Sequence, residues 1–247
     1  MPDLDSCLEI AKSATLLAGN FLKEQQDSNL KILKNQARDL KLQIDIDAEE
    51  IIKEHINANS SLPILAEESG KSGALDDCFW VVDPLDGTSN FLRNIPISCV
   101  SIALVQGFTP ILGAIFDFNN SDLYFAHKKS KAFVNKSEIN VSSLNFKKES
   151  TLVTGIPAKD NYSDDEFSNM ISDFHSWKKI RMIGSAAMAS VYVAAGKAEA
   201  YKENGIFLWD IAAGAAIVEA AGGKVSISNH QSDFRVDAYF TNNNLEK

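Results

Sequence analysis

The stretch from Trp80 to Phe91 constrains this chain more than any other part of its sequence. Four apolar residues, Phe79 to Val82, have the length and composition of a buried strand. Asp83-Pro84-Leu85-Asp86 follows at once, and a proline cannot continue a central strand but favours a turn. We therefore expect Asp83 and Asp86 on a tight turn at the carboxyl end of a strand, where open α/β sheets bind their ligands.

The residues of this turn predict a bound cation. Two carboxylates three residues apart repel each other unless a cation lies between them. The Leu85 carbonyl, between Asp83 and Asp86 in sequence, offers a third hard oxygen ligand. Gly87 and Thr88 follow with backbone amides and a hydroxyl that suit a phosphate group or a bound water. The stretch therefore predicts a divalent-metal phosphate site.

Composition limits the remaining possibilities. With 247 residues, 45% hydrophobic and 23% charged, the chain suits one large globular domain or two fused sub-domains. Its formal net charge of -9 argues against binding nucleic acid through bulk charge. Cys7, Cys78 and Cys99 show no metal-ligand spacing, which favours a reduced, cytoplasmic compartment. The sequence shows no signal peptide and no apolar run of membrane-spanning length, so we expect a soluble protein with no membrane partner.

Hydrophobic periodicity predicts a mixed α/β (α+β) chain without internal repeats. We expect helices at residues 4–22, 45–56, 164–174, 185–195 and 211–221. We expect strands at residues 64–66, 79–82, 100–105, 111–118, 123–126, 152–154, 179–183, 199–201, 224–228 and 238–241, with a further hairpin within 131–141. Residues 23–37 lack a pattern and predict a loop. The polar stretch 142–149 is the expected boundary between an N-terminal α+β sub-domain, 1–145, and a C-terminal α/β sub-domain, 146–247.

Further acids stand at the ends of apolar segments. Glu67 follows the strand at 64–66, and Asp210 begins the helix at 211–221. Each acid taken singly has an ordinary structural explanation, such as a solvated loop for Glu67 or a helix N-cap for Asp210. Taken together with Asp83 and Asp86, they describe a cage of hard oxygen ligands. Such a cage suits Mg²⁺ with its waters and a substrate phosphate.

Three motifs of the chain resemble the inositol monophosphatase family, whose members are metal-dependent, lithium-sensitive sugar-phosphate phosphatases. The motifs are Asp83-Pro84-Leu85-Asp86-Gly87-Thr88-Ser89-Asn90-Phe91, Glu67-Glu68-Ser69 upstream of it, and Trp209-Asp210-Ile211-Ala212-Ala213-Gly214 downstream. Their order and spacing match over nearly the whole chain. The resemblance implies a layered α/β/α/β/α sandwich of the sugar-phosphatase type, and it implies a homodimer.

The resemblance also assigns metal ligands. It implies that Glu67, Asp83 and the Leu85 carbonyl bind a first Mg²⁺, and that Asp83, Asp86 and Asp210 bind a second. Asp83 would then bridge the ions, as in two-metal sites with ions about 4 Å apart. The family implies two or three Mg²⁺ ions in all.

The catalytic residues follow from the same resemblance. The amides of Gly87 and Thr88 are expected to hold the phosphate, and the Thr88 hydroxyl to orient the attacking water together with an upstream acid. Spacing favours Asp45 as that acid, with Asp47 as second choice. Lys41 stands where the family commonly has a threonine. Whichever acid is not used has an ordinary role in the first turn of a helix.

Substrate contacts are expected from two segments. Gly184-Ser185-Ala186 opens a helix after a strand, so its amides are available to an anionic or hydroxylated substrate. The resemblance assigns this segment and Glu203 to substrate hydroxyls, although Glu203 has an alternative as a surface acid beside Lys202. Arg181 either faces the substrate or simply ends a strand.

The sequence therefore predicts a Mg²⁺-dependent phosphomonoesterase for a small polyol or sugar phosphate, with inositol 1-phosphate first among substrates and two-metal activation of water. Fructose 1,6-bisphosphate and 3'-phosphoadenosine 5'-phosphate remain alternatives, because the metal motifs do not discriminate among them. A regulatory partner of the transcription machinery ranks lower, since the acidic chain offers no basic RNA-binding face. A structural Ca²⁺ cage is disfavoured by the adjoining Gly87-Thr88 pair.

Overall fold

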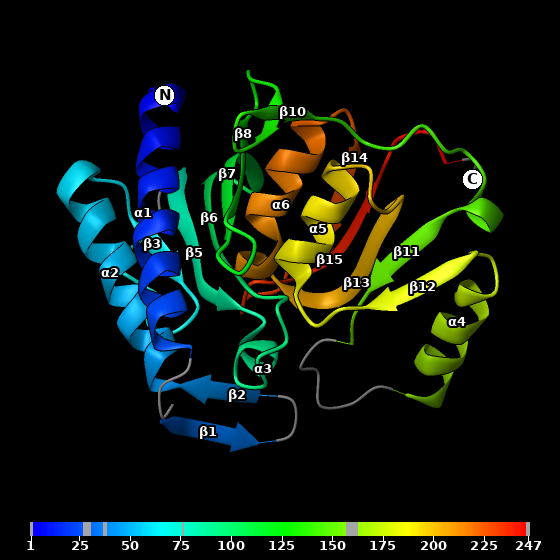
Figure 1. Cartoon of the computed structure of the whole chain (residues 1–247), viewed down its shortest axis with the longest axis horizontal. Helices are drawn as coiled ribbons and strands as arrows, with labels where there is room; N and C mark the ends of the chain where they lie inside the picture. The colour runs from blue at the N-terminus through cyan, green and yellow to red at the C-terminus, as the bar shows by residue number, and fades with distance from the viewer. Residues whose placement is uncertain (1, 27–30, 37–38, 76, 157–162, 246–247) are drawn as a thin grey trace.

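The molecule is built on two β-sheets stacked with helices. The computed structural model describes residues 2–26, 31–36, 39–75, 77–156 and 163–245. The larger sheet has eight strands and the smaller sheet has five. Figure 1 shows the two sheets on either side of two central helices. The expected α/β fold is confirmed.

Five helices make the layers around these sheets. Helices α5 (Ala186–Ala194) and α6 (Leu208–Ala220) lie between the two sheets, and most residues in them are buried. Helices α1 (Leu4–Gln25) and α2 (Gln43–Asn59) cover the outer face of the larger sheet. Helix α4 (Asp164–Phe174) lies outside the smaller sheet (Figure 1). The order is α/β/α/β/α, as the family resemblance implied.

The larger sheet has the strand order β10-β9-β8-β7-β6-β5-β3-β4. All its pairs are antiparallel except β3 with β5, so the expected meander at 100–126 and the hairpin after it are confirmed. Its strands are β3 (Ile64–Ala66), β4 (Gly70–Lys71), β5 (Cys78–Asp86), β6 (Cys99–Gln106), β7 (Thr109–Asp117), β8 (Asp122–His127), β9 (Ala132–Val134) and β10 (Ser137–Ile139).

The smaller sheet has the order β12-β11-β13-β15-β14. Strand β11 is parallel to both of its neighbours, β12 and β13, and the remaining pairs are antiparallel. The chain leaves β11 through α4 to reach β12 on one side, and then passes through α5 to reach β13 on the other. The strands are β11 (Thr151–Thr154), β12 (Lys179–Met182), β13 (Ala200–Phe207), β14 (Lys224–Ser228) and β15 (Arg235–Thr241).

Strand β5 shows why the sequence around it is continuously apolar. Phe79 and Val81 contribute to the core around α5 and α6, whereas Trp80 and Val82 contribute to the core under α1 and α2. A strand with a core on each face needs apolar residues at every position rather than at alternate ones. The apolar residues therefore keep β5 in the interior up to Val82, and Asp83 follows directly after them.

One expectation about the N-terminal part was wrong. Residues 23–37 do not form a single loop, because α1 extends to Gln25 and β1 (Ile32–Gln36) pairs with β2 (Asp39–Leu42) as a separate two-stranded sheet. Ile32 and Leu33 are exposed. Two successive exposed residues give no alternation of core-facing apolar positions, so this part of the sequence carries no strand signal. Residues 27–30 and 37–38 lie outside the described part of the chain.

Two short elements complete the chain, α3 (Thr88–Phe91) after β5 and a 3₁₀ turn (Lys147–Glu149) before β11. The division into residues 1–145 and 146–247 stays a prediction; the core around α5 and α6 includes residues from both parts, such as Phe79 and Phe240. Within the described ranges, each helix is too short or too polar to cross a bilayer.

Close packing of β7 on α6 gives a first prediction. A Cβ on Gly113 would overlap the backbone carbonyl of Ala213, and backbone cannot move aside as a flexible side chain can. Gly113→Ala should therefore lower the free energy of unfolding by about 1–3 kcal/mol, measured by urea denaturation. Gly73→Ala is the matched control, because nothing lies within 4 Å of the added carbon. Equal stability of the two variants would contradict the packing described here.

Candidate active site

The acids of the opening motif lie on a bulge rather than on a turn. Strand β5 runs through Pro84 to Asp86, with Asp83 opposite Ser101 and Asp86 opposite Cys99. Three steps on β5 therefore match two on β6, which is one extra residue, and bulges are where a sheet tolerates proline. The expected turn at Asp83 was wrong in this detail. The extra residue brings both acids to the same side of the sheet, where an unbroken strand would have placed them on opposite sides.

Backbone groups around Asp83 fix the loop that follows. The amide of Leu85 donates to Asp83 Oδ1 at 3.0 Å, and the Thr88 hydroxyl donates to the Leu85 carbonyl at 3.0 Å. That carbonyl keeps a second lone pair for another ligand. Gly87 has φ of +89°, and a Cβ there would lie 2.7 Å from the Ile97 carbonyl, so this position requires glycine twice over.

Three carboxylates from distant segments meet beside this loop. Glu67, Asp83 and Asp210 each place one oxygen so that all three oxygens lie within 4.8 Å of one another. Oxygens on opposite sides of a Mg²⁺ ion are about 4.2 Å apart, because each bond is about 2.1 Å. Asp83 Oδ2 is buried and, among the described residues, receives no hydrogen bond. A buried anionic oxygen without a donor fits a cation.

Asp210 is held by the helix that it begins. It is the third residue of α6 rather than its N-cap, and its Oδ2 accepts from the amide of Phe207, the cap residue, at 3.2 Å. Asp45 stands at the same position of α2, with Oδ2 accepting from the amide of Leu42 at 2.7 Å. The N-cap explanation of Asp210 was therefore wrong by three positions. In both acids the helix start fixes one oxygen and so orients the carboxylate.

Asp86 accepts hydrogen bonds from the N-terminus of α5. Its Oδ2 accepts from the Ser185 hydroxyl at 2.6 Å and from the amide of Ala187 at 2.7 Å. Ser185 is buried, and its oxygen also caps the helix by accepting from Met188. The Ser185 hydroxyl and the Ala187 amide are thus already bonded to a carboxylate. The roles of Gly184, Ser185 and Ala186 toward a substrate stay predictions.

Crowding raises the pKa of every carboxyl in the cage. Desolvation is the largest cause for each acid. It raises the pKa of Glu67 to about 8, with help from the charges of Glu68, Asp45 and Asp86, although the Glu67 residue as a whole is exposed at the rim. The pKa values of Asp83 and Asp210 lie well above their ordinary range, and neighbouring carboxylates add to the shift.

The pKa of Asp86 rises less, to about 6. Desolvation raises it, while the hydrogen bonds from Ser185 and from the first amides of α5 lower it. Together the four acids prefer to hold protons unless a cation replaces them.

The two candidate water-orienting acids have different surroundings. Asp45 is 2% exposed, and its charge helps to raise the pKa of Glu67, so Asp45 lies in the neighbourhood of Glu67. Asp47 is exposed and accepts from Gln43 Nε2 at 2.9 Å on the surface of α2.

Glu203 is a buried acid, so its alternative as a surface residue was wrong. It is 8% exposed and accepts from the Tyr201 hydroxyl at 3.0 Å. Desolvation, with a smaller contribution from the charge of Asp86, raises its pKa to about 7 despite that hydrogen bond. Arg181 is exposed on β12 and donates to the Ile180 carbonyl at 3.0 Å.

Two residues at the site had no assigned role from the sequence. Asn90 Nδ2 donates to the carbonyls of Ile97 and Ile183, both at 2.8 Å, and so ties the β5 loop to the segment before α5. Its place in the opening motif was the only available signal. Gly155 follows β11, and a Cβ there would lie 2.6 Å from a Glu203 carboxylate oxygen. A glycine directly after a short strand was the only sign of this close approach.

Comparison with known proteins agrees with this geometry. A model described as the inositol monophosphatase family matches residues 3–245. The chain is 40% identical to an inositol-1-monophosphatase of Synechocystis sp., over 91% of this chain and 79% of that protein. It is 36% identical to a Nus factor SuhB of Xylella fastidiosa, over 88% and 80%. An inositol monophosphatase structure from Anabaena (Nostoc) sp. superposes with a TM-score of 0.83 at 31% identity, covering 98% of this chain and 92% of that one.

The raised pKa values predict how stability depends on pH. A carboxyl whose folded-state pKa is raised stabilises the fold below its ordinary pKa near 4, and this contribution is lost as pH rises through about 6 for Asp86 and about 8 for Glu67. The metal-free protein should therefore lose thermal stability between about pH 5 and about pH 8. Mg²⁺, which competes with the protons, should restore more stability at the higher pH.

Differential scanning fluorimetry with and without Mg²⁺ at several pH values measures this effect. Glu67→Gln is the control, because it removes one of the titrating groups and should flatten the pH dependence. A Mg²⁺ stabilisation that is the same at both ends of the range would contradict the cage.

Proposed function

Because this chain belongs to the inositol monophosphatase family, we propose that its carboxylate cage is the metal centre of a hydrolase for small polyol phosphates. Family membership makes the chain a metal-dependent phosphoric monoester hydrolase. The observation that carries the proposal is the meeting of Glu67, Asp83 and Asp210 beside the Gly87-Thr88 loop. We propose inositol 1-phosphate as the first substrate, with fructose 1,6-bisphosphate and 3'-phosphoadenosine 5'-phosphate as alternatives.

The cage residues divide between two Mg²⁺ sites. Glu67, Asp83 and the Leu85 carbonyl would hold one ion, and Asp83, Asp86 and Asp210 would hold the other. The donor set is entirely hard oxygen, which suits Mg²⁺ better than softer metals. Bound there, Mg²⁺ would neutralise phosphate charge and lower the pKa of a water molecule.

Thr88 and Asp45 are the residues proposed to orient the attacking water. The Thr88 hydroxyl donates its proton to the Leu85 carbonyl, so its lone pairs are left to accept a hydrogen bond from water. Asp45, fixed by the Leu42 amide and buried on the side of the cage, would accept the other water proton. We prefer it to Asp47, whose carboxylate bonds Gln43 on the exposed face of α2.

Binding of the rest of the substrate falls to polar groups at the rim. The amides of Gly87 and Thr88 would hold phosphate oxygens at the start of α3. Glu203 would accept from hydroxyls of the alcohol, since a carboxylate is an acceptor without protons of its own. Gly184, Ser185 and Ala186 would line the same side. We also propose a homodimer, for which light scattering is the direct test.

A regulatory role in transcription is a second candidate. The observation that favours it is the relative named Nus factor SuhB, which covers most of this chain. The net charge of -9 counts against it, because bulk charge does not favour nucleic acid. Co-purification with RNA polymerase from lysate of the source organism would support this role, and its absence would leave the phosphatase alone.

Loss of one metal ligand tests the centre itself. Asp210→Asn keeps an oxygen that accepts from the Phe207 amide, so α6 should still begin normally. The missing charge should lower kcat by about a hundredfold or more at saturating Mg²⁺, measured by phosphate release from inositol 1-phosphate. Near-wild-type turnover would overturn the assignment, provided that the unfolding temperature shows a folded variant.

A matched pair of variants tests the water-orienting acid. Asp45→Asn keeps the hydrogen bond from Leu42 but removes the proton acceptor, and should lower kcat by about a hundredfold or more. Asp47→Asn, two residues away on the exposed face of the same helix, should leave kcat within about twofold of wild type. The opposite ranking would assign the role to Asp47.

A further inference from the structure

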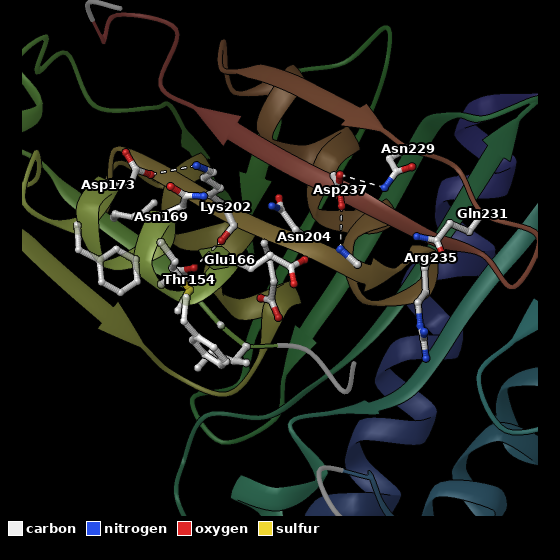
Figure 2. Close-up of a pocket in the computed structure, with 18 residues that line it drawn as sticks. Thr154, Glu166, Asn169, Asp173, Lys202, Asn204, Asn229, Gln231, Arg235 and Asp237 are labelled. Carbon is white, nitrogen blue, oxygen red and sulfur yellow. Dashed lines mark hydrogen bonds and ion pairs between the residues drawn. The ribbon is translucent and has the colours of Figure 1, made fainter. Parts of the chain in front are cut away.

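A cavity of about 380 Å³ lies between α4 and the outer face of the smaller sheet. Figure 2 shows side chains of α4, β13 and β15 around it, among them Asn169, Asn204 and Asp237. Its volume is within the range of small-molecule sites in proteins. Of the residues that line the cavity, only Glu203 was assigned a role from the sequence motifs.

Both walls of this cavity combine apolar and polar side chains. On α4, Phe167, Met170 and Phe174 recur at helical spacing and line the cavity, yet no residue of α4 is fully buried. The sheet opposite presents polar side chains, including Lys202 and Asn204, beside apolar Leu152, on whose cluster Phe174 packs. A cavity lined by both apolar and polar side chains suits a ligand with both apolar and hydroxyl-bearing faces.

Charges in the lining exclude an anionic ligand. Lys202 Nζ lies 3.0 Å from Asp173 Oδ2, and Arg235 Nε lies 3.6 Å from Asp233 Oδ2, so both cations among the described lining residues have an acid beside them. Asp237 and Glu203 add further negative charge. A second phosphate would therefore be repelled, whereas hydroxyl groups find carboxylate and carboxamide partners.

The cavity reaches the proposed active site at the end of β11. Strand β11 stops at Thr154, at the point where the connections to its two parallel neighbours leave in opposite directions, and such switch points are where α/β sheets bind ligands. Gly155 and Glu203 line the cavity there, and only a residue without a side chain fits at position 155, because a Cβ would lie 2.6 Å from a Glu203 carboxylate oxygen. Glu203 in turn lies near enough to Asp86 to feel its charge.

We propose that this cavity binds a second, uncharged sugar ring of the substrate, whose first ring carries the phosphate and contacts Glu203. The preferred substrate is then the monophosphate of a disaccharide or glycosylated polyol. Ring carbons would pack on Phe167 and Met170, and ring hydroxyls would bond Asn204. This inference rests on the proposed function, because it places the phosphate in the carboxylate cage.

A matched pair of substrates isolates the second ring. Trehalose 6-phosphate differs from glucose 6-phosphate only by an additional glucose, and sucrose 6-phosphate provides a second such ester. For the wild-type enzyme with Mg²⁺, kcat/KM for at least one of these disaccharide esters should exceed that for glucose 6-phosphate by about tenfold or more. Met170→Trp, which fills the cavity, should remove this advantage and leave glucose 6-phosphate hydrolysis unchanged.

Ile171→Trp is the control variant, because Ile171 is the next residue of α4, is 51% exposed and does not line the cavity. It should change neither substrate. Equal rates for both esters in the wild type, or an equal loss on both in Met170→Trp, would overturn the inference.

Binding of the unphosphorylated disaccharides separates this inference from the proposed function. Saturation-transfer NMR should detect trehalose or sucrose on the wild type and on Ile171→Trp but not on Met170→Trp. If inositol 1-phosphate and glucose 6-phosphate are not hydrolysed at all, the proposed function fails, and the NMR result alone decides whether the cavity binds a sugar. Absence of binding to the wild type would overturn the sugar site.

Discussion

Repulsion among buried carboxylates is the constraint on which the rest of this structure depends. Glu67, Asp83, Asp86 and Asp210 come from three separate parts of the chain, and each loses hydration where they meet. Burying like charges opposes folding, so such a cluster persists only where the surrounding fold is stable enough to hold it. The two large cores on either face of the eight-stranded sheet provide that stability. A cation turns the same repulsion into binding energy.

Backbone amides fix the orientation of the carboxylates without neutralising their charge. The amides of Leu85, Ala187 and Phe207 each donate to one oxygen of Asp83, Asp86 and Asp210, respectively. Each carboxylate is thereby oriented, while its charge is kept for a ligand. Two of these donors stand at helix starts, where amides lack partners within the helix. The carboxylates are therefore oriented by ordinary backbone amides, two of which belong to the starts of helices that meet at this site.

Part of this arrangement was predictable because its signals are local. The acids were recognisable because they stand at the ends of apolar segments. The strand before them was recognisable because a strand buried on both faces requires a continuous run of apolar residues. The bulge at Pro84 was not predictable, because it exists only relative to the register of β6. The β1–β2 hairpin showed no alternating pattern in the sequence, and the two described side chains of β1, Ile32 and Leu33, are exposed. The bond from Ser185 to Asp86 joins residues 99 positions apart, and only the packed fold brings them together.

The hydrogen bond from Ser185 to Asp86 also bears on where we propose that substrate selection takes place. The N-terminus of α5 is a site of positive potential that would otherwise attract an anionic substrate, but Asp86 already occupies its donors. In the proposed function, these two donors hold a metal ligand in place and do not contact the alcohol. We propose that selection of the alcohol then depends mainly on Glu203 and on the polar side chains of the smaller sheet beyond it. That face is covered mainly by α4, whose residues are not fully buried, so its side chains change at little cost to the core. In this proposal, the metal chemistry and the choice of substrate depend on different parts of the fold.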